Sequence, residues 1–283
     1  MRRSRLLLGA VVALLGVALV SPLRERMFGP KRLRFPYLAR PIPAATYAAL
    51  AAKPGWAKSA LQVAPGVELR GLVRRPISAS APWVLFYPGN DESQLTRGQD
   101  FLQALAGDLG WGLAVFAYRG YDASDGKAEL ASMRADAPEI LARLCAAEAL
   151  APARVHIAGF SIGGHFAVHA ARGAALSGAR AASLILLASV DDIVMYQPSR
   201  WEKLSAGEDY QTRPYLQGVP APVLVLQGTA DKALDGPQQG RNLARALGTR
   251  ARYEELPGVE HVPLLFDQKA LALVREFVLE HSR

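Results

Sequence analysis

Cysteine is nearly absent from this sequence, which contains a single one, Cys145, in 283 residues. The chain therefore cannot form an internal disulfide bond, and its fold has to be stabilised by a hydrophobic core in any redox compartment. Hydrophobic residues make up 51% of the sequence, which is enough to build such a core in one large domain. Cys145 lies in an Ala- and Leu-rich segment, where we expect it to be a small buried packing residue.

The chain also lacks excess positive charge over most of its length, although its formal net charge is +8. The first 34 residues contain eight Arg and Lys residues against one Glu, so the remainder has a net charge of only +1. A surface that binds nucleic acid needs cationic side chains gathered on one face of the folded part. No predicted element carries such a stripe, so we expect no nucleic-acid partner.

Charged side chains are missing from the eighteen-residue run Leu6 to Leu23, which follows the basic start Met-Arg-Arg-Ser-Arg. A run of this length is just sufficient to cross a bilayer as a helix. It also resembles a secretory signal, but there is no good Ala-x-Ala cleavage site near Val20 and no cysteine placed for lipid attachment. We expect residues 1–23 to be an uncleaved membrane anchor, with a cleaved signal or a buried helix as the alternatives.

The next segment, residues 24–60, contains five prolines and several basic residues. This composition predicts a linker at the membrane surface, where the basic side chains contact anionic headgroups. Basic residues flank the apolar run on both sides, so the positive-inside rule gives no clear orientation. We expect the usual arrangement for a short N-terminal tail, with the domain on the extracytoplasmic, or periplasmic, side of the membrane.

From residue 61 onward, short apolar runs alternate with segments of helical spacing. Two runs around Pro65-Gly66, Leu61–Val63 and Val67–Val73, predict a hairpin. Five later runs lack two-residue alternation, which is typical of parallel strands buried on both faces. These runs are Trp83–Tyr87, Leu113–Tyr118, Val155–Gly159, Leu184–Ala188 and Val223–Gln227. The order predicts one α/β domain over residues 61–283, with a mostly parallel central sheet and helices on both faces.

The most informative motif is Gly-x-Ser-x-Gly at residues 159–163, between an apolar strand and a helical segment. This context places Ser161 at a sharp strand-to-helix turn, with Gly159 and Gly163 leaving room for a strained backbone. The start of the helix also favours negative charge that develops as the hydroxyl attacks. Ser161 is therefore the candidate nucleophile, while a glycine-rich turn that only packs is the alternative.

A serine hydroxyl needs a base that removes its proton and a third group that orients the base. Only His261 and His281 follow the later strands, and His281 is two residues from the C-terminus. His261 lies on a loop between the apolar-alternating residues 253–256 and a final helical segment, which makes it the better candidate for the base.

The acid should follow an earlier parallel strand, at the edge of the sheet where such folds build their sites. Asp231 comes directly after the run Val223–Gln227 and is the first choice. The fallback positions are Asp191, Asp192 and Asp235.

Two backbone N–H groups are needed for the oxyanion of a tetrahedral intermediate. The residue after the nucleophile, Ile162, supplies one, and the loop after the first central strand supplies the other. That loop reads Tyr87-Pro88-Gly89-Asn90-Asp91, and Asn90 is the candidate donor. An ordinary Pro-Gly-Asn turn is the alternative reading.

Over residues 60–280 these motifs resemble the α/β-hydrolase superfamily, and within it the lysophospholipase-like and serine-aminopeptidase-like branch. Residues 118–126 look like the branch's Tyr-Arg-Gly-Tyr-Gly-x-Ser-x-Gly loop, with Asp122 in place of the usual glycine. Pro88-Gly89 stands where the family often has His-Gly. The resemblance implies hydrolysis of an ester, thioester or amide through an acyl-enzyme on Ser161, without a metal or an organic cofactor.

With the predicted anchor, this implies a carboxylesterase or lysophospholipase-like enzyme acting on a partly apolar, lipid-like acyl substrate. A serine aminopeptidase is the nearest alternative, and it needs an acidic group such as Glu202 or Glu208 to hold a free amine. A binding protein that has kept the fold without catalysis is a third hypothesis. Oligomeric state is not predicted.

Two further features point to structure more than to chemistry, and a third predicts part of the substrate pocket. His165 and His169 lie four residues apart on one helix, but no obvious third metal ligand is near, so we expect no metal site. Arg119 is expected to form a structural ion pair. Residues 191–219 interrupt the alternation and carry several aromatic residues, which predicts a lid-like insertion with an apolar wall over Ser161.

Overall fold

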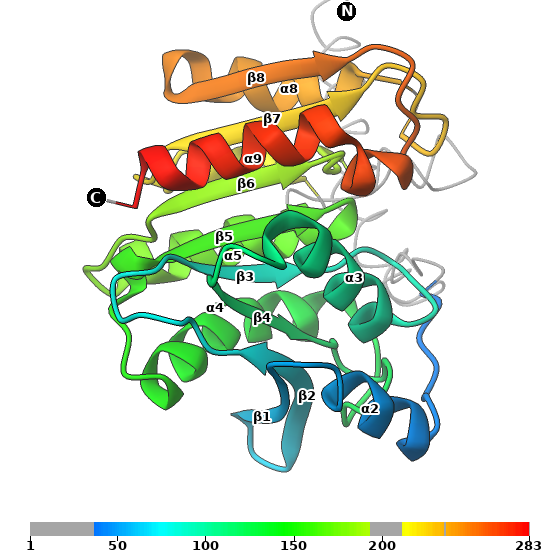
Figure 1. Ribbon diagram of the computed structural model, residues 1–283. Coiled ribbons are helices and arrows are strands. Elements are labelled where there is room, and N and C mark those ends of the chain that lie inside the picture. The colour runs from blue at the N-terminus through cyan, green and yellow to red at the C-terminus, as the bar shows by residue number, and fades with distance from the viewer. Residues whose placement is uncertain (1–36, 193–210, 235, 283) are drawn as a thin grey trace, which may run out of the picture. The chain divides into compact units, whose positions relative to one another are not determined.

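The computed structural model describes residues 37–192, 211–234 and 236–282. Within these ranges the strands form one eight-stranded sheet in the order β1-β2-β4-β3-β5-β6-β7-β8 (Figure 1). The strands are β1 (Trp56–Ala64), β2 (Val67–Arg74), β3 (Trp83–Tyr87), β4 (Gly112–Phe116), β5 (Val155–Phe160), β6 (Ser183–Leu187), β7 (Val223–Gly228) and β8 (Ala251–Leu256). The helices are α2 (Ala44–Ala51), α3 (Gln94–Ala106), α4 (Leu130–Ala147), α5 (Ile162–Leu176), α7 (Arg213–Leu216), α8 (Gln238–Leu247) and α9 (Gln268–Glu280).

The sheet is antiparallel at one edge and parallel elsewhere. β1 pairs with β2 and β2 with β4 in antiparallel ladders, and all pairs from β4 to β8 are parallel. Every residue of β3, β4, β5 and β6 is buried, as is every residue of β7. This confirms the interpretation of the apolar runs as parallel strands covered on both faces.

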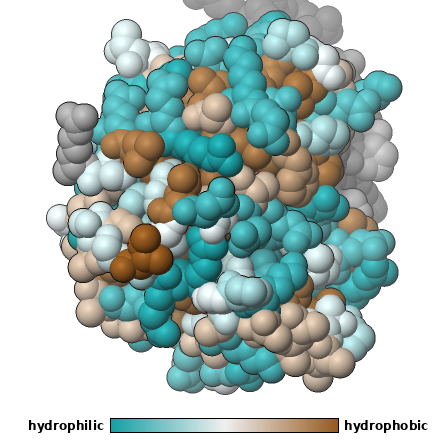
Figure 2. All heavy atoms as spheres, viewed as in Figure 1, coloured by the Kyte–Doolittle hydropathy of each residue, from teal (hydrophilic) through white to brown (hydrophobic). Residues whose placement is uncertain are grey.

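Helices cover both faces of this sheet. α3 and α9 pack against each other on one face, where Arg275 of α9 donates to the carbonyl oxygens of Leu105 and Ala104 at 2.7 Å each. α4, α5 and α8 lie behind the sheet in the same view (Figure 1). On the α3 and α9 side, hydrophilic side chains surround small apolar patches (Figure 2). Cys145 is buried in α4, in agreement with its predicted packing role.

The start of the domain differs from the boundary expected at residue 61. Part of the expected linker is folded, because α2 buries Tyr47 and Leu50 and β1 already begins at Trp56. The Tyr47 hydroxyl donates to the Gly71 carbonyl oxygen of β2 at 2.8 Å. The prolines of this stretch do not oppose the helix, because Pro43 stands directly before α2 and Pro54 after it.

Two other expected segments fall largely outside the described residues. These are the membrane anchor at residues 1–23 and, within the expected insertion, residues 193–210. None of the helices in the described ranges combines the length and the apolar character needed to span a bilayer.

Candidate active site

Ser161 occupies a strained turn between the last residue of β5 and the first residue of α5. Its φ is 55° and its ψ −124°, a conformation that costs a non-glycine residue about 1–3 kcal/mol. The surrounding backbone holds it there. The Ser161 N–H donates to the Leu187 carbonyl oxygen at 3.0 Å, and its own carbonyl accepts from the Val190 N–H at 3.2 Å. A strained residue fixed from both sides in this way is typical of functional sites.

The two glycines of the motif are required by close packing. A Cβ at Gly163 would lie 2.1 Å from the Tyr87 carbonyl oxygen, and one at Gly159 would lie 2.5 Å from the Gly163 carbonyl oxygen. Neither glycine has a positive φ, so the strained conformation belongs to Ser161 itself. The glycines therefore let β5, α5 and the loop after β3 approach closely around the serine.

Asp231 and His261 form a hydrogen-bonded pair. Asp231 follows β7, His261 lies on the loop after β8, and Asp231 Oδ2 is 2.7 Å from His261 Nδ1. Asp231 Oδ1 accepts the N–H groups of Ala233 and Leu234 at 3.0 Å each. The carboxylate is fully buried, whereas the imidazole is 16% exposed. A buried acid thus orients a ring that stays accessible at its other side.

The imidazole lies beside the strained turn. The ring centroids of His261 and Phe160, the residue before Ser161, are 4.7 Å apart. With Nδ1 bonded to Asp231, Nε2 is the ring nitrogen left to serve the serine. Among the described residues no hydrogen bond joins the Ser161 hydroxyl to His261. The three predicted residues therefore meet at one edge of the sheet, with one of their two expected hydrogen bonds formed.

The fallback acids have other partners. Asp191 is buried and its Oδ1 is 2.6 Å from Nε of Arg213. Burial raises the pKa of Asp191, and Arg213 opposes that rise. Asp192 pairs with Gln211 in an isolated β-bridge at the base of the expected insertion. Asp235 lies outside the described residues.

The loop that carries Asn90 is tied to its neighbours by three successive residues. The three bonds are Tyr118 Oη to the Pro88 carbonyl at 2.8 Å, Gln94 Nε2 to the Gly89 carbonyl at 3.0 Å, and Tyr121 Oη to Asn90 Oδ1 at 2.6 Å. A Cβ at Gly89 would lie 3.4 Å from Ser161 Cβ, so the loop lies against the serine. Ile162 is buried as the first residue of α5, where backbone N–H groups have no acceptor inside the helix.

Gln227 is a residue of this site that the sequence reasoning missed. It ends the apolar run of β7, is fully buried, and its Nε2 donates to Asp231 Oδ2 at 2.8 Å. Its signal in the sequence is a polar residue at the end of an otherwise apolar strand, just before the candidate acid. Gln94, Tyr118 and Tyr121 were missed in the same way, because their contacts join separate elements.

Arg119 and the histidines His165 and His169 were expected to have structural roles, and their contacts in the structure are as follows. Arg119 forms a two-pronged ion pair with Asp136 at 2.5 and 2.6 Å, as expected. His165 Nδ1 is 3.0 Å from Thr212 Oγ1, and burial lowers the pKa of His165 well below its usual range. In the part of the chain that the structure describes, no third His, Cys, Asp or Glu joins His165 and His169 in a metal-ligand group.

A second histidine and serine pair lies at the opposite edge of the sheet. His156 Nδ1 is 2.8 Å from Ser183 Oγ, and its Nε2 is 3.0 Å from Ser282 Oγ. His156 and Ser183 stand at the amino ends of β5 and β6, whereas Ser161 follows the carboxyl end of β5. This pair is therefore separate from the candidate active site.

Comparison with known proteins identifies the fold. No protein-family model matches the chain, and no curated protein sequence matches it. Solved structures do match. An α/β-hydrolase from Vibrio vulnificus has a TM-score of 0.70 at 19% identity, over 93% of each chain. Esterase 2 from Thermogutta terrifontis has a TM-score of 0.63 at 19% identity, over 80% of this chain and 95% of its own. A bacterial membrane phospholipase A has a TM-score of 0.58 at 20% identity, over 98% and 99%.

The described domain thus has the α/β-hydrolase fold, as the motifs predicted. Along the chain, the strained turn at Ser161 comes first, Asp231 follows and His261 comes last, and the acid and the histidine are hydrogen-bonded to each other.

Proposed function

We propose that this chain is a serine hydrolase that cleaves an ester, thioester or amide through an acyl-enzyme on Ser161. One observation carries the proposal: a buried Asp231 orients the accessible His261, whose ring packs on Phe160, the residue before the strained Ser161. Residues that only pack need neither the backbone strain nor an acid bonded to the ring.

In the proposed reaction, Ser161 Oγ attacks the acyl carbon and its proton passes to His261 Nε2. The tetrahedral intermediate collapses as its bond to the leaving group breaks and His261 returns the proton to that group. Water then attacks the acyl-enzyme with His261 again as the base, and this step releases the acid. Asp231 keeps the proton of the neutral imidazole on Nδ1 and stabilises the imidazolium that forms in each step.

The proposed oxyanion donors are the backbone N–H groups of Ile162 and Asn90. Ile162 begins α5, and Asn90 lies on the loop that contacts the serine turn. Preorganised donors of this kind typically contribute about 3–4 kcal/mol of transition-state stabilisation each. Pro88 stands where the resembling family often has a histidine, and its carbonyl oxygen accepts a hydrogen bond from the Tyr118 hydroxyl.

For the substrate we propose a partly apolar acyl group, as in the reactions of a carboxylesterase or a lysophospholipase. Support comes from the apolar run at residues 6–23, which would keep the domain beside lipid, and from structural neighbours that include an esterase and a phospholipase. The aminopeptidase alternative needs an acidic anchor for a free amine. Its candidates, Glu202 and Glu208, lie outside the described residues.

A substrate series tests this proposal. Purified full-length protein in detergent is assayed with p-nitrophenyl esters of two to twelve carbons, a lysophospholipid and aminoacyl p-nitroanilides, beside Ser161→Ala and a Ser183→Ala control. We expect ester hydrolysis that Ser161→Ala abolishes and Ser183→Ala retains. Hydrolysis of the anilides alone would favour the peptidase, and activity that survives in Ser161→Ala would contradict the mechanism.

We also propose that residues 1–23 anchor the chain in a membrane and that the domain lies on the extracytoplasmic side. The proposal depends on the uncharged run and its basic flanks. Paired reporters fused after residue 283 test it, one fluorescent only in the cytoplasm and one active only after export. Activity of the export reporter in the membrane fraction is expected, and cytoplasmic fluorescence would reverse the orientation.

A further inference from the structure

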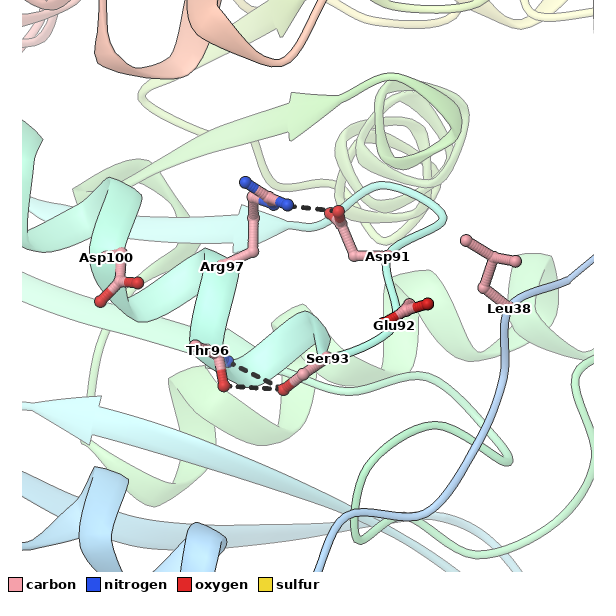
Figure 3. A pocket seen from close by; sticks show the side chains of 7 residues that line it. All are labelled: Leu38, Asp91, Glu92, Ser93, Thr96, Arg97 and Asp100. Atoms are coloured by element: carbon pink, nitrogen blue, oxygen red, sulfur yellow. Dashed lines mark hydrogen bonds and ion pairs between the residues drawn. The ribbon is translucent and has the colours of Figure 1, made fainter.

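The segment that enters the domain from the N-terminal side passes directly beside the loop of Asn90. The Leu38 N–H donates to Asn90 Oδ1 at 2.8 Å, across 52 positions of sequence. Asn90 Oδ1 also accepts from the Tyr121 hydroxyl, so one amide oxygen receives a hydrogen bond from each of two chain segments. In Figure 3, Leu38 lies on this entering segment and faces the loop of Asp91 and Glu92 across a surface cavity of about 480 Å³.

Asp122 joins the same segment to the start of α3. Its N–H donates to the Arg40 carbonyl oxygen at 2.9 Å and its carbonyl accepts from the Ile42 N–H at 3.0 Å, so residues 40–42 lie along it as a short strand-like bridge. Its carboxylate accepts the N–H of Leu95, in the first turn of α3, at 2.6 Å. Asp122 is 2% exposed and has a φ of 51°.

The first turn of α3 returns to the Asn90 loop through Gln94. The side chain of Gln94 donates to the Gly89 carbonyl oxygen at 3.0 Å and accepts from the Tyr118 N–H at 2.8 Å. Gln94 is fully buried, so these bonds do not compete with water. An ion pair between Arg40 and Glu92 adds a second, exposed link between the entering segment and the loop.

We propose that residues 38–42, which we call the entry strap, position the loop that carries Asn90. Leu38 acts through its hydrogen bond to Asn90, and the strap's contact with Asp122 acts through α3 and Gln94. This inference rests on the proposed function and deepens it, because the two contacts fix the orientation of the Asn90 backbone N–H, which is a proposed oxyanion donor. Misplacing a group by about 1 Å typically costs up to 10²-fold in rate. The strap lies fifteen positions after the end of the proposed membrane anchor at residue 23, on the same stretch of chain.

Leu38→Pro and Leu38→Ala form the matched pair that tests the strap in the full-length protein. Proline removes the N–H that Asn90 accepts, whereas alanine keeps it and shortens a side chain that is already 48% exposed. We expect Leu38→Pro to lower kcat about tenfold with KM within about twofold of wild type. Leu38→Ala should stay within about twofold of wild type in both constants, because it keeps the donor.

Asp122 supplies a second pair. Asp122→Asn keeps an oxygen that can accept the Leu95 N–H, whereas Asp122→Ala removes it. We expect the alanine variant to lose at least about tenfold more kcat than the asparagine variant, because only alanine leaves a buried N–H without a partner. A role in stability alone would instead lower the thermal midpoint of both variants and leave kcat of the folded enzyme unchanged.

Amide hydrogen exchange over residues 88–93 gives a readout that does not need activity. The strap predicts faster exchange there in Leu38→Pro than in Leu38→Ala, together with the loss of kcat. Equal exchange and equal kcat in the two variants would overturn the proposal, as would faster exchange with unchanged kcat. If wild type hydrolyses no substrate, the proposed function fails, and exchange still decides whether the strap holds the loop.

Discussion

Each of the two edges of the central sheet holds a histidine bonded to a hydroxyl or carboxyl group. The two histidines differ in their exposure and in their hydrogen-bond partners. At the carboxyl edge, His261 is bonded through Nδ1 to a buried carboxylate and is 16% exposed. At the amino edge, His156 is bonded through both ring nitrogens to serine hydroxyls and is 1% exposed. Burial lowers the pKa of His156 to about 3, with His281 adding to the effect.

The difference shows what makes a histidine available for proton transfer. His156 has both nitrogens occupied, and among the described residues no ion pair with an acid stabilises a positive charge on it. Its ring therefore stays neutral and serves to fasten β5, β6 and the end of α9 together. His261 has an acid on one nitrogen and an open side at the other, so it can accept a proton and return it. A histidine near a serine is a common motif. Of these two arrangements, only that of His261 has the acid and the open ring nitrogen that proton transfer needs.

The largest expected effect comes from replacing each histidine in turn. His261→Ala should lower kcat/KM by about 10⁴-fold or more, because the nucleophile loses its base, with little change in stability. His156→Ala should leave kcat/KM of the folded protein within about threefold and lower the free energy of unfolding by about 1–3 kcal/mol, because it leaves the buried Ser183 hydroxyl unpaired. Kinetics and urea unfolding measured on both variants check this, and the reverse pattern would contradict it.

The acids give the next largest contrast. Asp231→Asn should lower kcat by about 10³–10⁴-fold, since an amide favours the wrong tautomer of His261. Asp191→Asn should stay within about tenfold of wild type, because Asp191 is paired with Arg213 and the Nδ1 of His261 is bonded to Asp231. Steady-state kinetics at one pH decide between the two, and a larger loss in Asp191→Asn would make that residue the acid.

The pH dependence of stability sharpens the comparison at the amino edge. The pKa of His156 is about 3 in the folded protein and near 6.5 in the unfolded chain. The unfolded chain therefore takes up the proton first, and stability falls as the pH drops below 6.5 toward 3, by up to about 1.4 kcal/mol per pH unit. Urea unfolding at pH 7, 5.5 and 4.5 should show a shallower decline in His156→Gln than in wild type. Equal slopes would contradict the sealed environment assigned to His156.

The pH dependence of stability that comes from Asp122 is opposite in sign to that from His156. Burial raises the pKa of Asp122 from 3.8 to about 6, so the folded protein takes up the proton first. Its contribution to stability increases as the pH falls from above 6 toward 4, by about 3 kcal/mol in total. Relative to Asp122→Asn, wild type should therefore gain stability over this range, and a relative loss would contradict the assignment.

The smallest effect concerns Gln227, a fully buried residue that donates a hydrogen bond to Asp231. Gln227→Leu should lower kcat about tenfold and leave KM within about twofold, because Asp231 loses one of its hydrogen bonds. Kinetics and a thermal midpoint measured together separate positioning from unfolding. A drop in the midpoint with unchanged kcat would make Gln227 a structural residue only.

The fold could be predicted from the sequence because it depends on local patterns, and the same patterns named the main residues of the candidate site. The run Trp83–Tyr87 is the strand β3, and Asp231 and His261 stand after the strands expected to carry them. The start of β1 at Trp56 was missed, because polar residues alternate through it and prolines precede it. Apolar runs and their order were thus enough to predict the architecture. The density of prolines led to a predicted domain start that lies after the true start of β1.

The supporting contacts were out of reach, since they join residues that no local pattern relates. Leu38 bonds to Asn90 across 52 positions, and an exposed leucine gives no sign that its backbone N–H has a partner. Asp122 was visible only as a replacement for an expected glycine. The structure explains the substitution, because its backbone keeps the positive φ that suits glycine while its carboxylate binds the start of α3. An acid is tolerated at this position because the hydrogen bond of its side chain to the Leu95 N–H offsets the backbone strain.

Covalent labelling tests most directly whether Ser161 is a nucleophile activated by His261. Full-length protein is treated with a fluorophosphonate probe, digested, and the modified residue is located by mass spectrometry, with His261→Ala treated in parallel. We expect one modified residue, Ser161, and labelling that is at least about 10²-fold slower without the imidazole. Modification of another serine such as Ser183, or no modification of the native protein, would contradict it.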